Sequence, residues 1–421
     1  MGLVCIVTKV PGGAVEKQWV CRSRSAPIRG GLTAPPTRTA KLSKYPDLRP
    51  HYHNSRLPLV PPYIAKLRPY EPGRNAEDVA RERGLSDVVK LASNENPLGP
   101  SPRAIEAVCG SLARLNLYPN GGLNLRRVLA REFQVKVENV IAGSGSEGII
   151  SNIIRTFLCD DDEVLTTEAA FIGFQVLARS RGVSYRTVPY RDWHYDLPAL
   201  ASAITARTKI IYLANPNNPT GTIFTKEEFG EFYRHVPERV LIILDEAYFE
   251  YARDNPRYPD SMQYRYDNVI TLRTFSKAYG LAGMRIGYGF AHEDLIANLL
   301  KVKLPFEPSG PAQAAGIAAL EDREFLRRSV DLNARGVQFL MSALADMGFE
   351  PAPSDANFVM LPLPSAECAS RIYEGLLARG IIVRPLAAFG LPNCLRISTG
   401  LDHQNRRLVQ ALSSLKQEVT A

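Results

Sequence analysis

The chain has 421 residues, of which 45% are hydrophobic, and a formal net charge of +8. Residues 1–60 contain ten of the 51 Lys and Arg residues but only two of the 43 acidic residues, so this segment carries the whole net charge. We therefore expect no basic nucleic-acid-binding surface on the rest of the chain. No apolar run approaches the roughly 18 residues of a membrane-spanning helix, so a soluble protein without a membrane partner is expected.

Residues 1–56 form a basic segment that is rich in Pro, Ser and Arg and lacks amphipathic periodicity. This composition predicts a non-catalytic, largely disordered extension, and it lacks the apolar core of a secretion signal. The six cysteines are scattered without a Cys-x-x-Cys pair, which favours reduced thiols and a cytoplasmic location. The six histidines show no metal-ligand spacing, so no metal site is expected.

A globular pattern begins at about residue 57 with a series of helices. In "RNAEDVARERGL", Asn75 is a candidate N-cap and Gly84 a candidate stop. In "SPRAIEAVCGSLARL", Ser101 is the expected cap and Pro102 occupies the first helical position. A third amphipathic helix is predicted in "NLRRVLAREFQV".

The stretch "VIAGSGSEGII" predicts a strand, a glycine turn and a helix. Its Gly143-x-Gly145-x-x-Gly148 spacing matches the dinucleotide-binding fingerprint. Backbone N–H groups at a helix N-terminus bind phosphate whatever molecule carries it. The motif alone therefore predicts an anion site and leaves its ligand open.

Apolar, β-branched runs of strand length then alternate with helical segments, one of which begins with the capping box Thr225-x-x-Glu228. The runs are "EVLTT" (163–167), "SYRTVPY" (184–190), "KIIYLAN" (209–215), "VLIILD" (240–245) and "NVITLRT" (268–274). This alternation predicts an α/β fold with a mainly parallel sheet between helices. Longer helices and the short strands "FVMLPL", "IIVRPL" and "CLRIST" after about residue 306 predict a smaller α+β domain.

Ligands of open α/β sheets bind beyond the carboxyl ends of the strands, and polar residues follow three of these strands. They are Asn218 in "NPNNPTG", Asp245 and Tyr248 in "DEAY", and Lys277 in "FSKAYG". A single ligand explains this set: an aldehyde cofactor that carries a phosphate and a ring nitrogen. The lysine would form a Schiff base, the aspartate would keep the ring nitrogen protonated, and arginine, serine and backbone N–H groups would hold the phosphate.

The motifs "SNENPLGPSP", "NPNNPTG", "DEAY" and "TFSKAYGLAGMRIGY" together resemble the fold-type-I pyridoxal-phosphate aminotransferases, and most closely the histidinol-phosphate aminotransferase family. The resemblance covers about residues 57–418. It implies an N-terminal arm and small-domain segment (57–104), a large cofactor-binding domain (105–305) and a small C-terminal domain (306–421). It also implies a transaminase of histidine biosynthesis that uses pyridoxal 5'-phosphate.

By this resemblance, Lys277 binds the cofactor aldehyde and transfers the substrate proton. Asp245 pairs with the ring nitrogen, Tyr248 and Asn218 contact the phenolic oxygen, and Phe171 stacks on the ring. Phosphate binding falls to the side chains of Ser276 and Arg285, and to the glycine turn at Gly145, Ser146 and Glu147. The family often has Asp or Asn where this chain has Glu147, so the resemblance supports only a backbone contact there.

The resemblance also assigns residues for the substrate and for a second subunit. Arg396 matches the arginine that binds the α-carboxylate of the amino-acid co-substrate. Arg384 matches one that contacts the phosphate of histidinol phosphate, and Tyr70 and Asn94 match residues near that substrate. Tyr118 resembles the tyrosine that reaches the cofactor phosphate of the neighbouring subunit, which implies a homodimer.

Four alternatives stay open at this point. An aromatic-amino-acid transaminase or a threonine-phosphate decarboxylase-like enzyme would use the same fold. A DNA-binding regulator with an aminotransferase-like domain would need a helix-turn-helix, for which the proline-rich basic segment is a poor match. A dinucleotide-dependent oxidoreductase would explain the glycine turn, with Glu168 as its acidic residue, but it would leave Lys277 and Asp245 unexplained.

Overall fold

The computed structural model describes residues 2–9, 15–22, 59–67, 73–264 and 266–420, with side chains for 59–67, 73–264 and 266–416. The chain divides into two units, Met1–Leu57 and Pro58–Ala421. In the first unit, strand β1 (Gly2–Lys9) pairs antiparallel with β2 (Val15–Arg22), where the sequence predicted no regular element. The first run contains Val4, Ile6, Val7 and Thr8, the second contains Val15, Trp19 and Val20, and the two runs flank a Pro-Gly-Gly sequence, a pattern that favours a hairpin.

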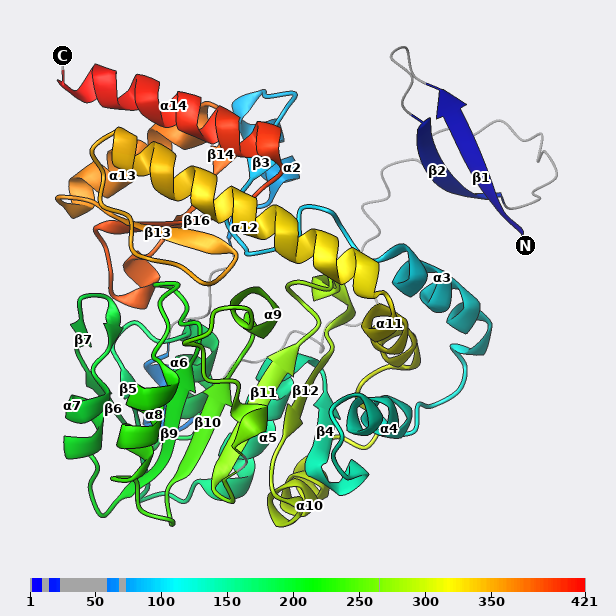
Figure 1. Ribbon diagram of the computed structural model, residues 1–421, viewed down its shortest axis with the longest axis vertical. Coiled ribbons are helices and arrows are strands. Elements are labelled where there is room, and N and C mark those ends of the chain that lie inside the picture. Colours follow the sequence, from blue (N-terminus) through cyan, green and yellow to red (C-terminus); the bar gives the residue numbers. More distant parts are fainter. Residues whose placement is uncertain (1, 10–14, 23–58, 68–72, 265, 421) are drawn as a thin grey trace, which may run out of the picture. The chain divides into compact units, whose positions relative to one another are not determined.

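Among the described residues, seven strands form the central sheet of the second unit, in the order β4–β12–β11–β10–β9–β5–β6 (Figure 1). They are β4 (Val140–Gly143), β5 (Glu163–Thr167), β6 (Ser184–Val188), β9 (Thr208–Ala214), β10 (Leu241–Asp245), β11 (Val269–Thr274) and β12 (Gly287–Phe290). Within this sheet β12 pairs antiparallel with β11 and β4, and the other pairs are parallel. The predicted α/β fold with a mainly parallel sheet is confirmed.

The predicted helix caps are also confirmed, because each capping side chain accepts a backbone N–H bond. Asn75 caps α2, Ser101 caps α3, and Thr225 and Glu228 form both bonds of the capping box of α8. No helix of the described residues is long and apolar enough to cross a membrane. The helices that precede or flank the sheet are α1 (Pro62–Ala65), α2 (Ala76–Arg83), α3 (Pro102–Ser111), α4 (Leu123–Glu132), α5 (Gly145–Phe157), α6 (Ile172–Ser180), α7 (Leu197–Ser202), α8 (Lys226–Tyr233), α9 (Phe249–Ala252), α10 (Glu293–Val302) and α11 (Gly310–Glu321).

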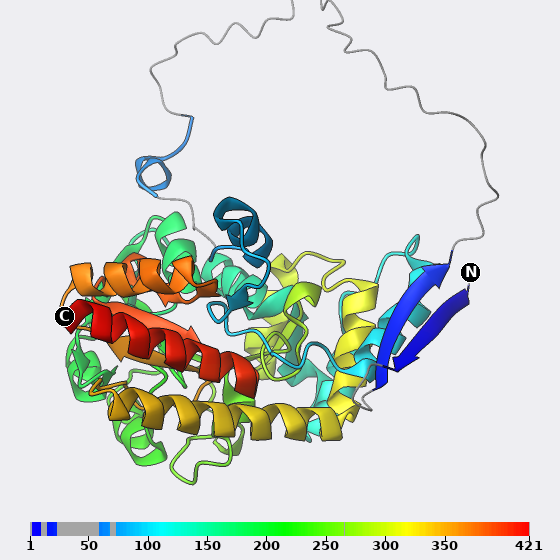
Figure 2. The same cartoon turned by 90° about the horizontal axis from the view of Figure 1, so that it is seen from above.

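The C-terminal part of the unit forms a second layer of structure. Strands β13 (Phe358–Pro362), β16 (Cys394–Ser398) and β15 (Arg384–Pro385) form an antiparallel sheet, and β14 (Ile381–Ile382) pairs in parallel with β3 (Val89–Lys90). Helices α12 (Arg323–Asp346), α13 (Ala366–Ala378) and α14 (Asp402–Thr420) pack beside one another over these strands (Figure 2). The pairing of β3 with β14 brings the segment just before α3 onto the C-terminal part of the chain.

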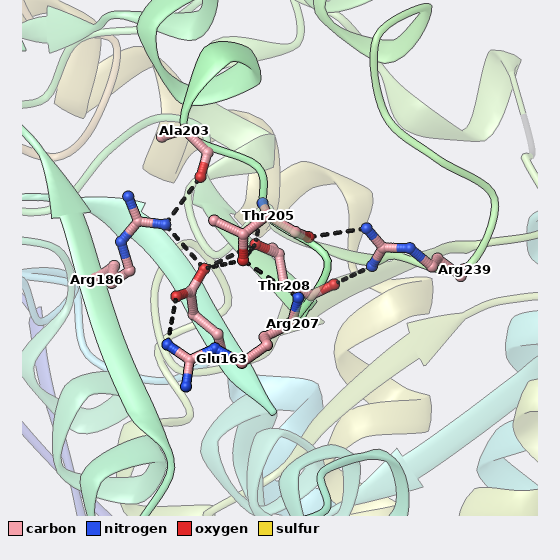
Figure 3. Close-up of polar contacts among 7 residues, drawn as sticks. All are labelled: Glu163, Arg186, Ala203, Thr205, Arg207, Thr208 and Arg239. Atoms are coloured by element: carbon pink, nitrogen blue, oxygen red, sulfur yellow. Dashed lines mark hydrogen bonds and ion pairs between the residues drawn. The ribbon is translucent and has the colours of Figure 1, made fainter. Parts of the chain in front are cut away.

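A polar network lies at the edge of the central sheet where β5 and β9 begin (Figure 3). Glu163 is only 1% exposed and accepts hydrogen bonds from Thr205 Oγ1, Thr208 Oγ1 and Arg186 Nη1, at 3.2, 2.8 and 3.0 Å. Arg239 donates to the backbone oxygens of Thr205 and Thr208. The carboxyl ends of the parallel strands lie at the opposite edge of the sheet, and the side chains of interest gather there.

Candidate active site

Lys277 and Asp245 line the same cavity, of about 170 Å³, at the carboxyl edge of the central sheet. Asp245 is the last residue of β10, and Lys277 follows β11, its parallel neighbour. The Lys277 Nζ atom lies 3.4 Å from the backbone oxygen of Ser93 and 5.8 Å from the centre of the Tyr248 ring. The parallel pairing of β10 and β11 thus brings together the lysine and the carboxylate predicted from separate motifs.

Burial shifts the ionisation of both groups toward neutrality. Desolvation raises the pKa of Asp245 to about 6, against the opposing hydrogen bonds from Tyr212 and the backbone N–H of Ala247. Desolvation, together with the positive charge of Arg396, lowers the pKa of Lys277 to about 8. Strongly shifted acid and base groups in one cavity are typical of catalytic sites.

One end of this cavity is built to receive an anion. Helix α5 begins at Gly145, whose φ of +80° favours glycine, and Ser146 and Glu147 line the cavity beside Ser276 and Arg285. A Cβ atom on Gly145 would lie 2.8 Å from Arg285 Nη2, so the glycine leaves room for the guanidinium. The helix N-terminus, a serine hydroxyl and an arginine together form a phosphate-binding arrangement.

A second cavity, of about 110 Å³, adjoins the first, and four residues line both cavities. The shared residues are Phe171, Asn218, Tyr248 and Lys277. The second cavity is also lined by the predicted substrate residues Asn94, Arg384 and Arg396, and by Phe389, which the sequence did not indicate. The two cavities are therefore compartments of one site, with Lys277 between them.

Hydrogen bonds fix the side chains on the shared wall. Arg396 is 5% exposed and donates from Nη1 to Asn218 Oδ1 at 2.6 Å and from Nη2 to the backbone oxygen of Ala92 at 2.8 Å. Asn94 is 1% exposed and donates from Nδ2 to the Tyr248 hydroxyl at 2.9 Å. Their positions are therefore set before any ligand binds.

Of the predicted site side chains that the structure describes, that of Tyr118 lies apart from both cavities. Tyr118 is 81% exposed and stacks on Phe306, with ring centres 4.2 Å apart. Tyr70 falls outside the described residues. Sequence reasoning also missed Tyr212, which lines the first cavity and donates a hydrogen bond to Asp245. Alternation along a strand places Tyr212 on the same face as Ala214, but the pairing of Ala214 with Asp245 is visible only in the structure.

The chain is similar to a known family of proteins over most of its length. The profile of the family "Aminotransferase class I and II" matches residues 86–412. The chain is 44% identical to the histidinol-phosphate aminotransferase of Anaeromyxobacter sp. (strain Fw109-5), over 85% of this chain and 99% of the relative. It is 41% identical to histidinol-phosphate aminotransferase 2 of Pseudomonas fluorescens (strain Pf0-1), over 85% of this chain and 97% of the relative.

A solved structure shows the same relationship. The histidinol-phosphate aminotransferase of Sinorhizobium meliloti, crystallised in complex with pyridoxal-5'-phosphate, superposes with a TM-score of 0.79 at 31% identity. The match covers 87% of this chain and 99% of that structure. The chain therefore belongs to the class I and II aminotransferases, and within them to the histidinol-phosphate aminotransferase family.

Proposed function

We propose that the protein is a transaminase that uses pyridoxal 5'-phosphate and acts on histidinol phosphate and 2-oxoglutarate, in the reversible reaction that gives imidazole-acetol phosphate and glutamate. This reaction belongs to histidine biosynthesis. The observation that carries the proposal is the presence of Arg384 and Arg396 in one cavity beside Lys277. Two positive charges at that position suit a substrate with an anionic group at a distance from its amine.

The residues of the first cavity fit pyridoxal phosphate. The α5 N-terminus with Ser276 and Arg285 would hold the phosphate, and the buried Asp245 carboxylate would hold the ring nitrogen in its protonated form. Tyr248 and Asn218 would contact the phenolic oxygen, and Phe171 the ring face. When bound, the cofactor withdraws electrons from the substrate and so acidifies its α-carbon.

Lys277 has the properties of the group that moves the substrate proton. With a pKa of about 8, roughly a tenth of its amine is neutral at pH 7, whereas an ordinary lysine is almost entirely charged. The neutral amine would take a proton from the substrate α-carbon as general base and, as the resulting ammonium, would deliver it to the cofactor carbon C4′ as general acid. Lys277 lines both cavities, which supports a role toward both the cofactor and the substrate.

The two arginines would divide the recognition of substrates. Arg396, held against Asn218, presents a planar fork suited to the α-carboxylate of glutamate or 2-oxoglutarate. The Arg384 side chain lies beside Gly73, because a Cβ atom built onto Gly73 would be 3.6 Å from Arg384 Nη1. It would bind the phosphate of histidinol phosphate, and Asn94 of the same cavity would lie near that substrate. Tyr70, outside the described residues, is proposed as a further contact from the resemblance alone.

The substrate assignment is tested by kcat/KM for histidinol phosphate, phenylalanine and tyrosine in the wild type and in Arg384→Ala. We expect Arg384→Ala to lose activity selectively on the phosphorylated substrate, because only that substrate loses a charge-assisted contact. The control is Arg371→Ala, an exposed arginine of α13. Equal losses on all substrates, or a wild type that prefers phenylalanine, would contradict the assignment. Release of CO₂ without a need for 2-oxoglutarate would indicate a decarboxylase instead.

We further propose that the active unit is a homodimer to which Tyr118 contributes across the interface. Tyr118 belongs to a patch of large apolar side chains that are 49–81% exposed in the single chain. The patch comprises Leu112, Leu115, Leu117, Tyr118, Leu304 and Phe306. Such a patch is unusual on the surface of a monomer and favours burial against another subunit.

Hybrid dimers test this shared site. Mixing Lys277→Ala subunits with Tyr118→Ala subunits should restore part of the activity, because one of the two sites in each hybrid regains both residues. If Tyr118 acts within its own subunit, no hybrid site would be intact and no activity would return. Sedimentation should show a dimer for the wild type and a larger share of monomer for Leu115→Lys, if the patch holds the two subunits together.

The domain arrangement and the location complete the proposal. We propose a basic segment (1–56), an arm and small-domain segment (57–104), a large cofactor-binding domain (105–305) and a small domain (306–421). The pairing of β3 with β14 supports the assignment of residues before α3 to the small domain. The cytoplasmic location rests on the scattered cysteines, of which Cys109, Cys159, Cys368 and Cys394 are free.

A further inference from the structure

Both oxygens of the Asp245 carboxylate are held by donors of the protein. The Tyr212 hydroxyl donates to Asp245 Oδ2 at 2.7 Å, and the backbone N–H of Ala247 donates to Oδ1 at 3.2 Å. Asp245 is 4% exposed, so solvent contributes little to its orientation. These two bonds therefore decide which way the carboxylate faces in the cavity that it shares with Lys277.

Tyr212 is itself rigidly placed. It lies within β9, is fully buried, and stacks on Phe174 of α6 with ring centres 4.0 Å apart and planes at 10°. It pairs with Ile243, two residues before Asp245 in β10. Burial raises the pKa of Tyr212 well above its ordinary value, so the hydroxyl stays protonated and acts toward the carboxylate as a donor.

The hydrogen bond from the Tyr212 hydroxyl opposes the groups that raise the pKa of Asp245. Desolvation is the main cause that raises the pKa of the carboxyl to about 6, and the neighbouring Glu246 raises it further. The Tyr212 and Ala247 bonds and the charge of Lys277 act in the opposite direction. Of the neighbouring tyrosines, Tyr195 also faces this region, but its hydroxyl accepts the backbone N–H of Ala214. Without Tyr212, a larger share of Asp245 would be protonated near neutral pH.

We propose that Tyr212 is a positioning residue that holds the Asp245 carboxylate in the orientation and the charged form in which it meets the ring nitrogen of the cofactor. The inference rests on the proposed function, because it concerns the binding of pyridoxal phosphate. A protonated Asp245 would offer a neutral group to a cationic nitrogen and lose the charge-assisted part of that hydrogen bond. Tyr212 therefore acts on the cofactor through Asp245.

The test compares Tyr212→Phe with the wild type by titrating the cofactor-free protein with pyridoxal phosphate at several pH values. The variant keeps the ring that stacks on Phe174 and loses only the hydroxyl. We expect its dissociation constant at pH 7 to rise about tenfold, which is near the lower limit of the effect of one hydrogen bond to a charged group. We also expect the pH below which affinity falls to move upward by about one unit.

The matched control is Tyr185→Phe. Tyr185 of β6 packs against the same Phe174 ring, with centres 6.3 Å apart, and lies outside the cavity lined by Asp245. It should leave both the affinity and its pH profile unchanged. The positioning role would be overturned if Tyr212→Phe kept the wild-type pH profile of cofactor affinity. It would also be overturned if Tyr185→Phe changed that profile in the same way.

A second variant separates this role from general damage to the sheet. In an Asp245→Asn background the charged partner is absent, so adding Tyr212→Phe should cause no further shift in the pH profile; a further shift would contradict the proposal. Failure of the proposed function would look different. In that case borohydride reduction of the wild type with pyridoxal phosphate would not label the Lys277 peptide.

Discussion

The buried carboxylate of Glu163 allows a quantitative prediction that is independent of the active site. It lies at the start of β5, 1% exposed, with two threonine hydroxyls and Arg186 donating to it (Figure 3). Glu163→Gln keeps the shape and one acceptor oxygen but removes the charge. Glu163→Ala removes the acceptor altogether and leaves the buried Thr208 hydroxyl without this partner.

The expected magnitudes follow from these contacts. A hydrogen bond to a charged group contributes about 1.5–3 kcal/mol, against about 0.5–1.5 kcal/mol for a neutral one. Weakening the Arg186 bond and the shorter threonine bond in Glu163→Gln should therefore lower the free energy of unfolding by about 2 kcal/mol. Glu163→Ala also leaves the buried Thr208 hydroxyl without this acceptor, which costs about 1–3 kcal/mol, whereas the Arg186 side chain left behind is 41% exposed and can be solvated. We therefore expect Glu163→Ala to lower the free energy of unfolding by about 3 kcal/mol.

Urea unfolding at a fixed protein concentration measures both values, provided that the slope with denaturant is unchanged. The control is Glu132→Gln, whose carboxylate pairs with Arg323 at 3.2 Å while the side chains are 41% and 79% exposed. An exposed pair of this kind contributes about 0–1 kcal/mol. The reasoning is refuted if Glu163→Ala unfolds within about 1 kcal/mol of the wild type or resembles the Glu132 control. Cofactor affinity should remain unchanged, because the network lies at the opposite edge of the sheet.

Three further predictions concern charged groups in the core and the site. Burial raises the pKa of Glu250 from 4.5 to about 7, so its contribution to stability is fully present below pH 4.5 and is lost as the pH rises to about 7. Thermal or urea unfolding above pH 7 should therefore show Glu250→Gln more stable than the wild type by up to about 3 kcal/mol, and a less stable variant would contradict this. Arg396→Gln should raise the pKa of Lys277 above about 8, because the substitution removes a neighbouring positive charge. The pH dependence of chemical modification of the Lys277 amine in the cofactor-free protein measures this pKa, and an unchanged profile would refute the prediction. Glu147→Gln should tighten pyridoxal phosphate binding a few-fold, since the Glu147 carboxylate lies 3.8 Å from Arg285; weaker binding would show that the carboxylate helps to hold the cofactor.

Local sequence patterns were sufficient for most strands and helices of the second unit and for the residues that follow the strands, but β12 in the glycine-rich segment after Lys277 was not predicted. Strand lengths and caps such as Asn75 depend on neighbours within a few positions, which a single sequence displays. The ends of parallel strands meet at one edge of a sheet, so the ligand residues Asp245 and Lys277 could be assigned to one site without knowledge of the strand order.

The missed features depend either on which strands pair and in which register, or on short runs that the overall composition of a segment conceals. Tyr212 contacts Asp245 because β9 and β10 are neighbours in one particular register, and neither order nor register is written in the local pattern. The β1–β2 hairpin was missed because the proline- and arginine-rich composition of residues 1–56 obscured two short β-branched runs at its start. The role of Tyr118 across a subunit interface was assigned from the resemblance alone; in the single chain its side chain is 81% exposed, and that role stays a proposal.

The same desolvation acts on the acid and the base of this site in opposite directions. It moves the pKa of Asp245 up to about 6 and that of Lys277 down to about 8. An aspartate and a lysine in water titrate more than six pH units apart, whereas here the interval is about two. Between these values Asp245 is a carboxylate and an appreciable fraction of Lys277 is neutral, which is the combination that the proposed chemistry needs. Cofactor affinity should consequently fall as the pH drops through about 6, whereas the proton-transfer step should gain as the pH approaches 8.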